Sequence, residues 1–322
     1  MKIEIGERLR PFSHMPGAAC LLPGTSLVIE AFPTLLRMGD REIRWPLTGP
    51  VVDFTLQQDL ERHCIFVFGR AKEGYFRLRI EGSDQGVHVE VEKGALEGIC
   101  VRCEIPFVPK APFERLSLGS HKAQDWELVQ KRCDLKQLLP TLFCLGQKIP
   151  RIPPQPLQGT ARLLTLPQER GELAAALEAF FKAAFTHLLV PRLKDDQHQG
   201  LVPEEEAKGD PAFLVQEGAK MIRSLFFEQT ERRLAFLPHL PIPFDTGRMV
   251  GLKAPGIGEI DFEWSKKKLR RALIRASVSG EVLLELQKEI KTIRVGKKKK
   301  QKGSEPLLLE AGQTYLLDRF EK

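Results

Sequence analysis

Residues 234–264, LAFLPHLPIPFDTGRMVGLKAPGIGEIDFEW, contain the pattern that decides the fold of this chain. Three prolines, Pro238, Pro241 and Pro243, lie near the start of the stretch, and proline interrupts a helix because it lacks the backbone N–H. From Glu259 to Trp264 polar and apolar residues alternate strictly, which is the period of a half-buried strand. The stretch therefore predicts a junction between a helical segment and a β unit.

The chain on the C-terminal side of this junction has the pattern of an antiparallel β domain, residues 236–322. Short apolar runs separated by Gly, Ser and charged turns predict strands near 257–264, 270–277, 281–286, 291–296, 306–309 and 313–318. The lysine-rich run Lys297–Lys300 falls between two of these strands and is predicted to form a hairpin loop.

Residues 1–112 are predicted to form an N-terminal β-sandwich. The clearest hairpin is residues 75–92, YFRLRIEGSDQGVHVEVE, where apolar and charged residues alternate on both sides of a turn. Several strands with one apolar face must stack sheet on sheet to bury those faces.

Residues 113–235 are predicted to be a linker and a short helical segment. Apolar residues recur at three- and four-residue steps from Leu173 to Leu188, and Asp210 with Pro211 supplies an N-cap and a first-turn proline for a second helix. The predicted fold class is thus mainly β with a helical middle (α+β).

The junction resembles the point at which a helical-barrel glycoside hydrolase enters its C-terminal β domain. In the clan of family 95 α-L-fucosidases and family 65 phosphorylases, similar elements occur in the same order as here: Phe236–Pro241, Gly251–Ala254, Glu259–Trp264 and Leu307–Leu317. The resemblance implies a carbohydrate-related protein whose last barrel helix precedes this domain.

The length of the middle segment limits what the resemblance implies. The related enzymes act inside a barrel of six helical hairpins, and twelve helices of ~11 residues with their loops need on the order of 190 residues. Residues 113–235 provide about 120, so the sequence predicts a reduced barrel remnant and no position onto which the family's catalytic carboxylates can be carried.

Local candidates for an acid–base pair come from one polar loop. Asp195, Asp196 and Glu205 lie there with Glu204, Glu206 and His198, and a carboxylate pair is what glycoside hydrolysis requires. The alternative interpretation is a charge-rich surface loop. Asp125, which lies outside this loop, is a further catalytic candidate.

Three further residues are candidates for sugar binding. Trp126 offers a flat ring, and His121 and Asp125 offer hydrogen bonds to hydroxyl groups. The alternative is a capped helix whose Trp126 and Leu128 pack on the core. His239 lies between two prolines and is a candidate for binding substrate in a cleft between the helical and β units. The alternative is a structural histidine at the contact between those units.

Composition excludes whole-chain disorder and predicts a soluble protein: 42% of residues are hydrophobic and 28% charged. The net charge of +7 is concentrated in Lys266–Lys268 and Lys297–Lys300, but neither run is interleaved with aromatic residues that stack bases, so nucleic acid is not the expected partner.

The sequence predicts a cytoplasmic protein without a metal or other cofactor. No apolar run is long enough for a signal peptide or a membrane span, and the six cysteines fit a reducing compartment. Cys100 and Cys103 are the only close cysteine pair, and no second Cys or His pair stands nearby at metal-ligand spacing.

Three functional hypotheses follow. The first is a glycosidase relative that has lost the complete barrel and acts in carbohydrate binding or as a scaffold. The second is an active α-L-fucosidase-like enzyme with a rebuilt site, and the third is a basic polyanion-binding protein. Each hypothesis is compatible with a partner chain or with a homo-oligomer.

Overall fold

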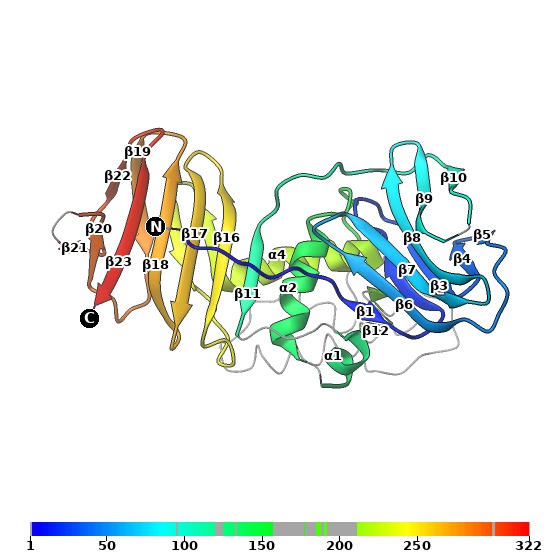
Figure 1. The fold of residues 1–322 in the computed structure, drawn as a ribbon. Helices are drawn as coiled ribbons and strands as arrows, with labels where there is room; N and C mark the ends of the chain where they lie inside the picture. Colours follow the sequence, from blue (N-terminus) through cyan, green and yellow to red (C-terminus); the bar gives the residue numbers. More distant parts are fainter. Residues whose placement is uncertain are drawn as a thin grey trace.

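The computed structural model describes residues 2–94, 96–119, 125–132, 134–156, 177, 185–187, 190–191, 211–297 and 300–321. Two β units lie at opposite ends of the molecule, and a helical layer lies between them (Figure 1). The chain is β-rich with a short helical part, as the sequence predicted.

The N-terminal unit is a sandwich of two sheets. One sheet has the order β1 (Phe12–Ser13), β6 (Val52–Asp59), β7 (Cys64–Ala71), β8 (Gly74–Ser83), β9 (Gly86–Lys93) and β10 (Ile99–Arg102). The other has the order β2 (Ala18–Leu21), β3 (Val28–Phe32), β4 (Leu35–Met38) and β5 (Arg41–Arg44). The buried faces of both sheets contribute to one hydrophobic core, and the Gln58 amide of β6 donates to the carbonyl of Leu21 in β2 at 2.6 Å.

The C-terminal unit also has two sheets. The larger has the order β11 (Arg115–Leu118), β16 (Gly247–Ala254), β17 (Gly258–Ser265), β18 (Lys268–Ala276), β23 (Thr314–Glu321), β20 (Thr292–Val295) and β21 (Lys300–Lys302). The smaller has the order β14 (Phe227–Thr230), β15 (Arg233–Phe236), β19 (Gly280–Glu285) and β22 (Leu307–Leu309). Neighbouring strands are antiparallel except for the parallel pair β15 and β19.

The limits of the C-terminal unit differ from the predicted residues 236–322. β11 comes from the predicted linker, and it pairs with β16 to form one edge of the larger sheet. β14 also precedes residue 236, and β15 begins before it and ends at it. The C-terminal unit is therefore built partly from the segment that sequence patterns assigned to the helical middle.

The helical layer contains α1 (Trp126–Arg132), α2 (Leu135–Gly146) and α4 (Pro211–Phe226). α4 begins at the predicted proline. Most of the predicted helix between Leu173 and Leu188 lies outside the described residues, although Leu177 is helical and buried. Phe185–His187 form the strand β12, which pairs with β13 (Val190–Pro191), so these three residues do not form the predicted helix.

Aromatic side chains join α4 to the C-terminal unit. Phe226, at the end of α4, stacks on Trp264 of β17 with ring centroids 5.2 Å apart. The Trp264 indole N–H donates to the carbonyl of Phe244 at 3.0 Å, and the ring of Phe236 meets that of Phe262 edge to face at 5.2 Å. The junction stretch thus supplies most of the rings that hold the last helix against the β domain.

Residues 2–10, which we call the N-terminal strap, run across the larger C-terminal sheet before entering the N-terminal sandwich (Figure 1). Arg248 of β16 donates to the carbonyl of Glu4 at 3.1 Å, and Ser117 of β11 donates to the Glu7 carboxylate at 2.9 Å. At its other end, the Leu9 N–H donates to the Glu61 carboxylate at 2.9 Å. The strap therefore ties the two β units together.

None of the helices in the described part of the chain is long and apolar enough to cross a membrane.

Close contact between α2 and α4 depends on a glycine. A Cβ added to Gly146 would lie 2.5 Å from the Cβ of Ala219 and 2.6 Å from the carbonyl oxygen of Val215. We expect Gly146→Ala to force the helices apart and to lower the free energy of unfolding by about 1–3 kcal/mol. Urea denaturation followed by circular dichroism measures this loss.

The matched control lies in the opposite helix. A Cβ on Gly218 of α4 meets nothing within 4 Å, so Gly218→Ala is expected to raise stability by about 0.5–1 kcal/mol through helix propensity. Equal effects of the two substitutions would contradict the close approach at Gly146.

Candidate functional site

A pocket of about 420 Å³, which we call the junction pocket, lies where α2 and α4 meet the start of β11. Its volume falls in the usual range of small-molecule sites. Its described lining consists of Glu114, Phe143, Gly146, Gln147, Arg151, Gln216, Ala219, Lys220 and Arg223.

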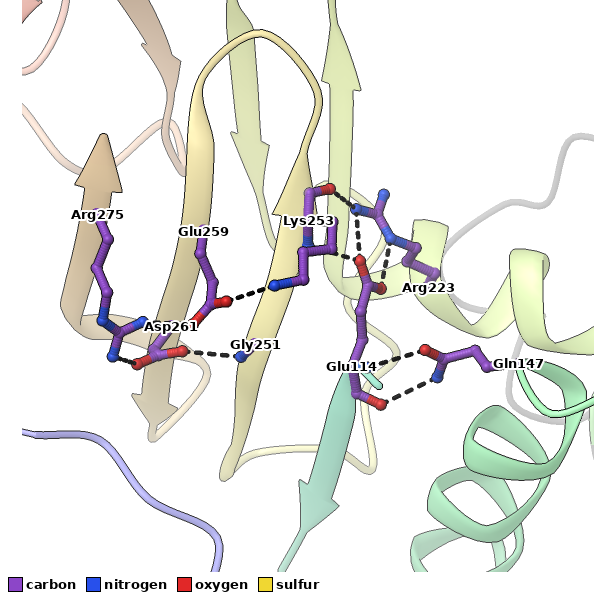
Figure 2. A network of polar contacts seen from close by, with 8 residues as sticks. All are labelled: Glu114, Gln147, Arg223, Gly251, Lys253, Glu259, Asp261 and Arg275. Atoms are coloured by element: carbon purple, nitrogen blue, oxygen red, sulfur yellow. Dashed lines mark hydrogen bonds and ion pairs between the residues drawn. The ribbon is translucent and has the colours of Figure 1, made fainter. Parts of the chain in front are cut away.

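The Glu114 carboxylate joins a helix to a strand beside this pocket (Figure 2). Arg223 of α4 donates to both of its oxygens, at 2.7 and 3.2 Å, and the backbone N–H of Lys253 in β16 donates to one of them at 2.8 Å. Arg223 also donates to the carbonyl of Lys253 at 2.9 Å. The side chain of Glu114 is thereby held as a fixed part of the pocket wall.

Two glutamine amides hold the backbone around the pocket. Gln147 accepts the Glu114 N–H and donates to the Glu114 carbonyl, both at 2.9 Å (Figure 2). Gln216 of α4 accepts the Ile152 N–H at 3.2 Å and donates to the carbonyl of Pro150 at 3.1 Å. The proline-rich connector after α2 is thus fixed against α4.

A chain of charges continues from the pocket into the larger sheet (Figure 2). The Lys253 ammonium lies 2.5 Å from Glu259, and Arg275 donates to Glu259 at 3.0 Å. Arg275 also pairs with Asp261, a fully buried carboxylate that accepts the Gly251 N–H at 2.8 Å. The Lys253 hydrogen bond lowers the pKa of Glu259, and the Asp261 hydrogen bond raises the pKa of Arg275.

The rim of the junction pocket is cationic. Arg223 is fixed by Glu114, and Lys220 pairs with Glu217. Arg151 is exposed and forms no ion pair within the described part of the chain. These groups donate hydrogen bonds, and the pocket is suited to a ligand rich in oxygen acceptors.

Glycoside hydrolysis by inversion needs two carboxyl groups roughly 6.5–9.5 Å apart, and the described lining of the pocket does not contain such a pair. Glu114 is the one carboxylate among the described lining residues. Its oxygens already accept hydrogen bonds from Arg223 and Lys253.

Trp126 and Asp125 do not lie at this pocket. Trp126 is only 1% exposed and packs in the core, so the expectation of a flat sugar platform is corrected: its ring faces are covered. Asp125 accepts the Leu128 N–H at 3.2 Å and caps α1. The structure matches the alternative of a capped helix, except that Leu128 is exposed rather than packed.

His239 is exposed and lies outside the junction pocket, with its Nε2 3.6 Å from the Glu228 carboxylate. The other candidates, His121, Asp195, Asp196 and Glu205, lie outside the described residues, as do Glu204, Glu206 and His198. No group of three His, Cys, Asp or Glu side chains gathers at metal-binding distances in the part of the chain that the structure describes.

Sequence patterns did not identify Glu114, Gln147 or Arg223. Arg223 lies between the apolar residues Ile222 and Leu225 of a helix. A charged residue beside the apolar face is the one local signal that its side chain has a partner within the fold.

The C-terminal unit has a recognisable relative. Residues 229–317 match the family model of the glycoside hydrolase family 95 C-terminal domain. The match runs from β14 into β23 and includes the whole junction stretch. It confirms the resemblance inferred from the sequence and covers the family 95-like β domain but not the N-terminal sandwich. No curated protein matches the chain.

A second set of buried titratable groups lies between the N-terminal sandwich and the end of α2. Burial and the nearby cations Lys148 and Lys110 lower the pKa of His63 to about 4. Burial also lowers the pKa of Lys148, whose ammonium lies 3.7 Å from the centroid of the Phe113 ring. The folded protein therefore favours the neutral form of His63.

The Glu114–Arg223 pair should contribute to stability because Glu114 is buried and Arg223 is partly buried. Glu114→Ala and Arg223→Ala are each expected to cost about 2 kcal/mol, and the double variant should lose about 1–3 kcal/mol less than the sum. Denaturant unfolding of the four proteins measures this coupling. Lys300→Ala, which breaks an exposed pair with Glu321, is the control and should change little. Additive losses would argue against the pairing.

His63 makes stability depend on pH. Its pKa is lower in the folded state, so the unfolded chain binds the extra proton, and stability falls as pH drops from about 6.5 to about 4, by up to about 1.4 kcal/mol per pH unit. His63→Asn, which tolerates the backbone φ of 62°, should flatten this slope in unfolding experiments at several pH values. His239→Asn controls for loss of an exposed imidazole, and an unchanged slope in His63→Asn would count against the buried neutral histidine.

Proposed function

We propose that this protein is a carbohydrate-binding relative of the family 95 glycoside hydrolases that works by recognition or as a scaffold. The observation that carries the proposal is the family 95 C-terminal domain match at residues 229–317, directly beside the junction pocket formed by α2, α4 and β11.

The chemistry of the pocket supports a sugar ligand. Sugar hydroxyl groups both donate and accept hydrogen bonds, and they are recognised by fixed polar groups in a concave site. Arg151, Lys220 and Arg223 supply donors at the rim, while the hydrogen-bonded amides of Gln147 and Gln216 keep the wall in place.

Loss of hydrolysis is part of the proposal. The residues between 113 and 235 are too few for a barrel of six helical hairpins, and the described pocket lining offers the single carboxylate Glu114. We also propose a cytoplasmic location, which agrees with the free thiols of the described cysteines.

Binding to an immobilised oligosaccharide panel tests the proposal. The wild-type protein should bind at least one neutral or charged glycan, and Arg151→Ala combined with Lys220→Ala should weaken that binding by about tenfold or more, equivalent to about 1.4 kcal/mol. Lys297→Ala combined with Lys302→Ala removes the same charge from the remote β20–β21 hairpin and is expected to bind normally. A panel without any hit, or equal losses in both variants, would refute the site.

A hydrolysis screen separates recognition from catalysis. Aryl-glycosides that include α-L-fucosides, tested with and without phosphate, are expected to give no turnover. Turnover that disappears on substitution of Asp125, Asp195, Asp196 or Glu205 would instead establish the alternative, an active glycosidase with a rebuilt site.

A further inference from the structure

A second depression, which we call the basic groove, lies in the C-terminal unit and has a volume of about 710 Å³. Three segments form it: residues 235–242 of the junction, the turn at Lys266–Lys268, and the loop at residues 285–290. It shares no described lining residue with the junction pocket.

The lining of the groove has an excess of positive charge. It includes four lysines and two glutamates, and Lys268 pairs with Glu289 at 3.0 Å. Lys266, Lys267 and Lys288 form no ion pair with any described residue. Four lysines against two glutamates leave the described lining with an excess of positive charge, which attracts an anionic ligand.

The turn that carries two of these lysines has an unfavourable sequence for its shape. Ser265 of β17 pairs with Lys268 of β18, which leaves Lys266 and Lys267 as a two-residue hairpin loop with φ values of 51° and 60°. Such a loop requires left-handed backbone at both positions and strongly favours Asn-Gly or similar pairs. Two lysines at these positions therefore cost stability relative to Asn-Gly, and strain of this kind is common at functional positions.

The backbone of this turn is fixed by Asp245, which follows the first segment, and by Gln287 of the third segment. The Lys267 N–H donates to the carbonyl of Asp245 at 2.9 Å, and the Gln287 amide donates to the carbonyl of Lys267 at 2.6 Å. Gln287 also accepts the Leu269 N–H at 3.1 Å. The cations thus extend from a preorganised base, which lowers the entropic cost of binding.

We propose that the basic groove binds an anionic oligosaccharide, a chain of sugars that bears sulfate or carboxylate groups. The proposal goes beyond carbohydrate binding at the junction pocket and does not depend on it. Lysine ammonium groups pair with sulfate or carboxylate. Nucleic acid is disfavoured because single strands bind through base stacking, and the one aromatic residue of the described lining, Phe236, is 1% exposed.

The decisive variant combines the substitutions Lys266→Asn and Lys267→Gly. Asn-Gly suits the left-handed turn, so the variant should fold and have a higher melting temperature than the wild-type protein. The same variant should bind a heparin-derived hexasaccharide roughly tenfold more weakly, with a shallower dependence of affinity on salt concentration. Lys288→Gln, which leaves the turn unchanged, should weaken the same binding. Isothermal titration calorimetry at two salt concentrations measures the affinity for the hexasaccharide and its dependence on salt.

Two comparisons complete the test. Lys297→Gln combined with Lys302→Gln removes two charges from the β20–β21 hairpin and should leave binding unchanged. The desulfated, carboxyl-reduced hexasaccharide and a single-stranded oligonucleotide of matched charge should bind at least tenfold more weakly than the native hexasaccharide.

The proposal is overturned if the hexasaccharide does not bind, if the remote and groove variants lose affinity equally, or if the oligonucleotide binds as tightly. Failure of the junction pocket would appear separately, as normal binding of the panel glycan by the Arg151→Ala and Lys220→Ala variant.

Discussion

The position of the helical layer on the C-terminal β unit depends on the Glu114 carboxylate. The carboxylate oxygens of Glu114 accept hydrogen bonds from the guanidinium of Arg223 in α4 and from the backbone N–H of Lys253 in β16. The backbone of Glu114 is hydrogen-bonded to the side chain of Gln147, which directly follows α2. A partly buried carboxylate is stable only when its partners are in place, so two helices and two strands must meet in a single arrangement. The junction pocket is the space that this arrangement leaves, and these hydrogen bonds hold part of its wall.

Much of the β architecture follows from local patterns. The alternation from Glu259 to Trp264 became β17, the run at residues 75–92 became the β8–β9 hairpin, and Pro211 became the first residue of α4. These features could be predicted because their physical cause, burial of one face or a missing N–H, acts within a few residues. The family 95 C-terminal domain match agrees with the same stretch.

The candidate site could not be predicted in this way because its contacts join distant residues. Glu114 and Arg223 are 109 positions apart, and each by itself has the pattern of an ordinary surface charge. Trp126 illustrates the opposite error: a tryptophan near polar residues has the composition of a sugar site, but tertiary packing places its ring in the core. Lys266 and Lys267 occupy a turn whose left-handed backbone their residue types do not favour, so that feature emerges only from the structure.

The N-terminal strap has a consequence for how the molecule assembles. Its Glu4 carbonyl and Glu7 carboxylate are synthesised early, whereas their partners lie 244 and 110 residues further along the chain. Contacts of such long sequence separation carry a large loop-closure cost and tend to form late. During synthesis, the strap cannot make its Arg248 contact until β16 has emerged from the ribosome, so this link between the two β units forms long after the strap itself has been made.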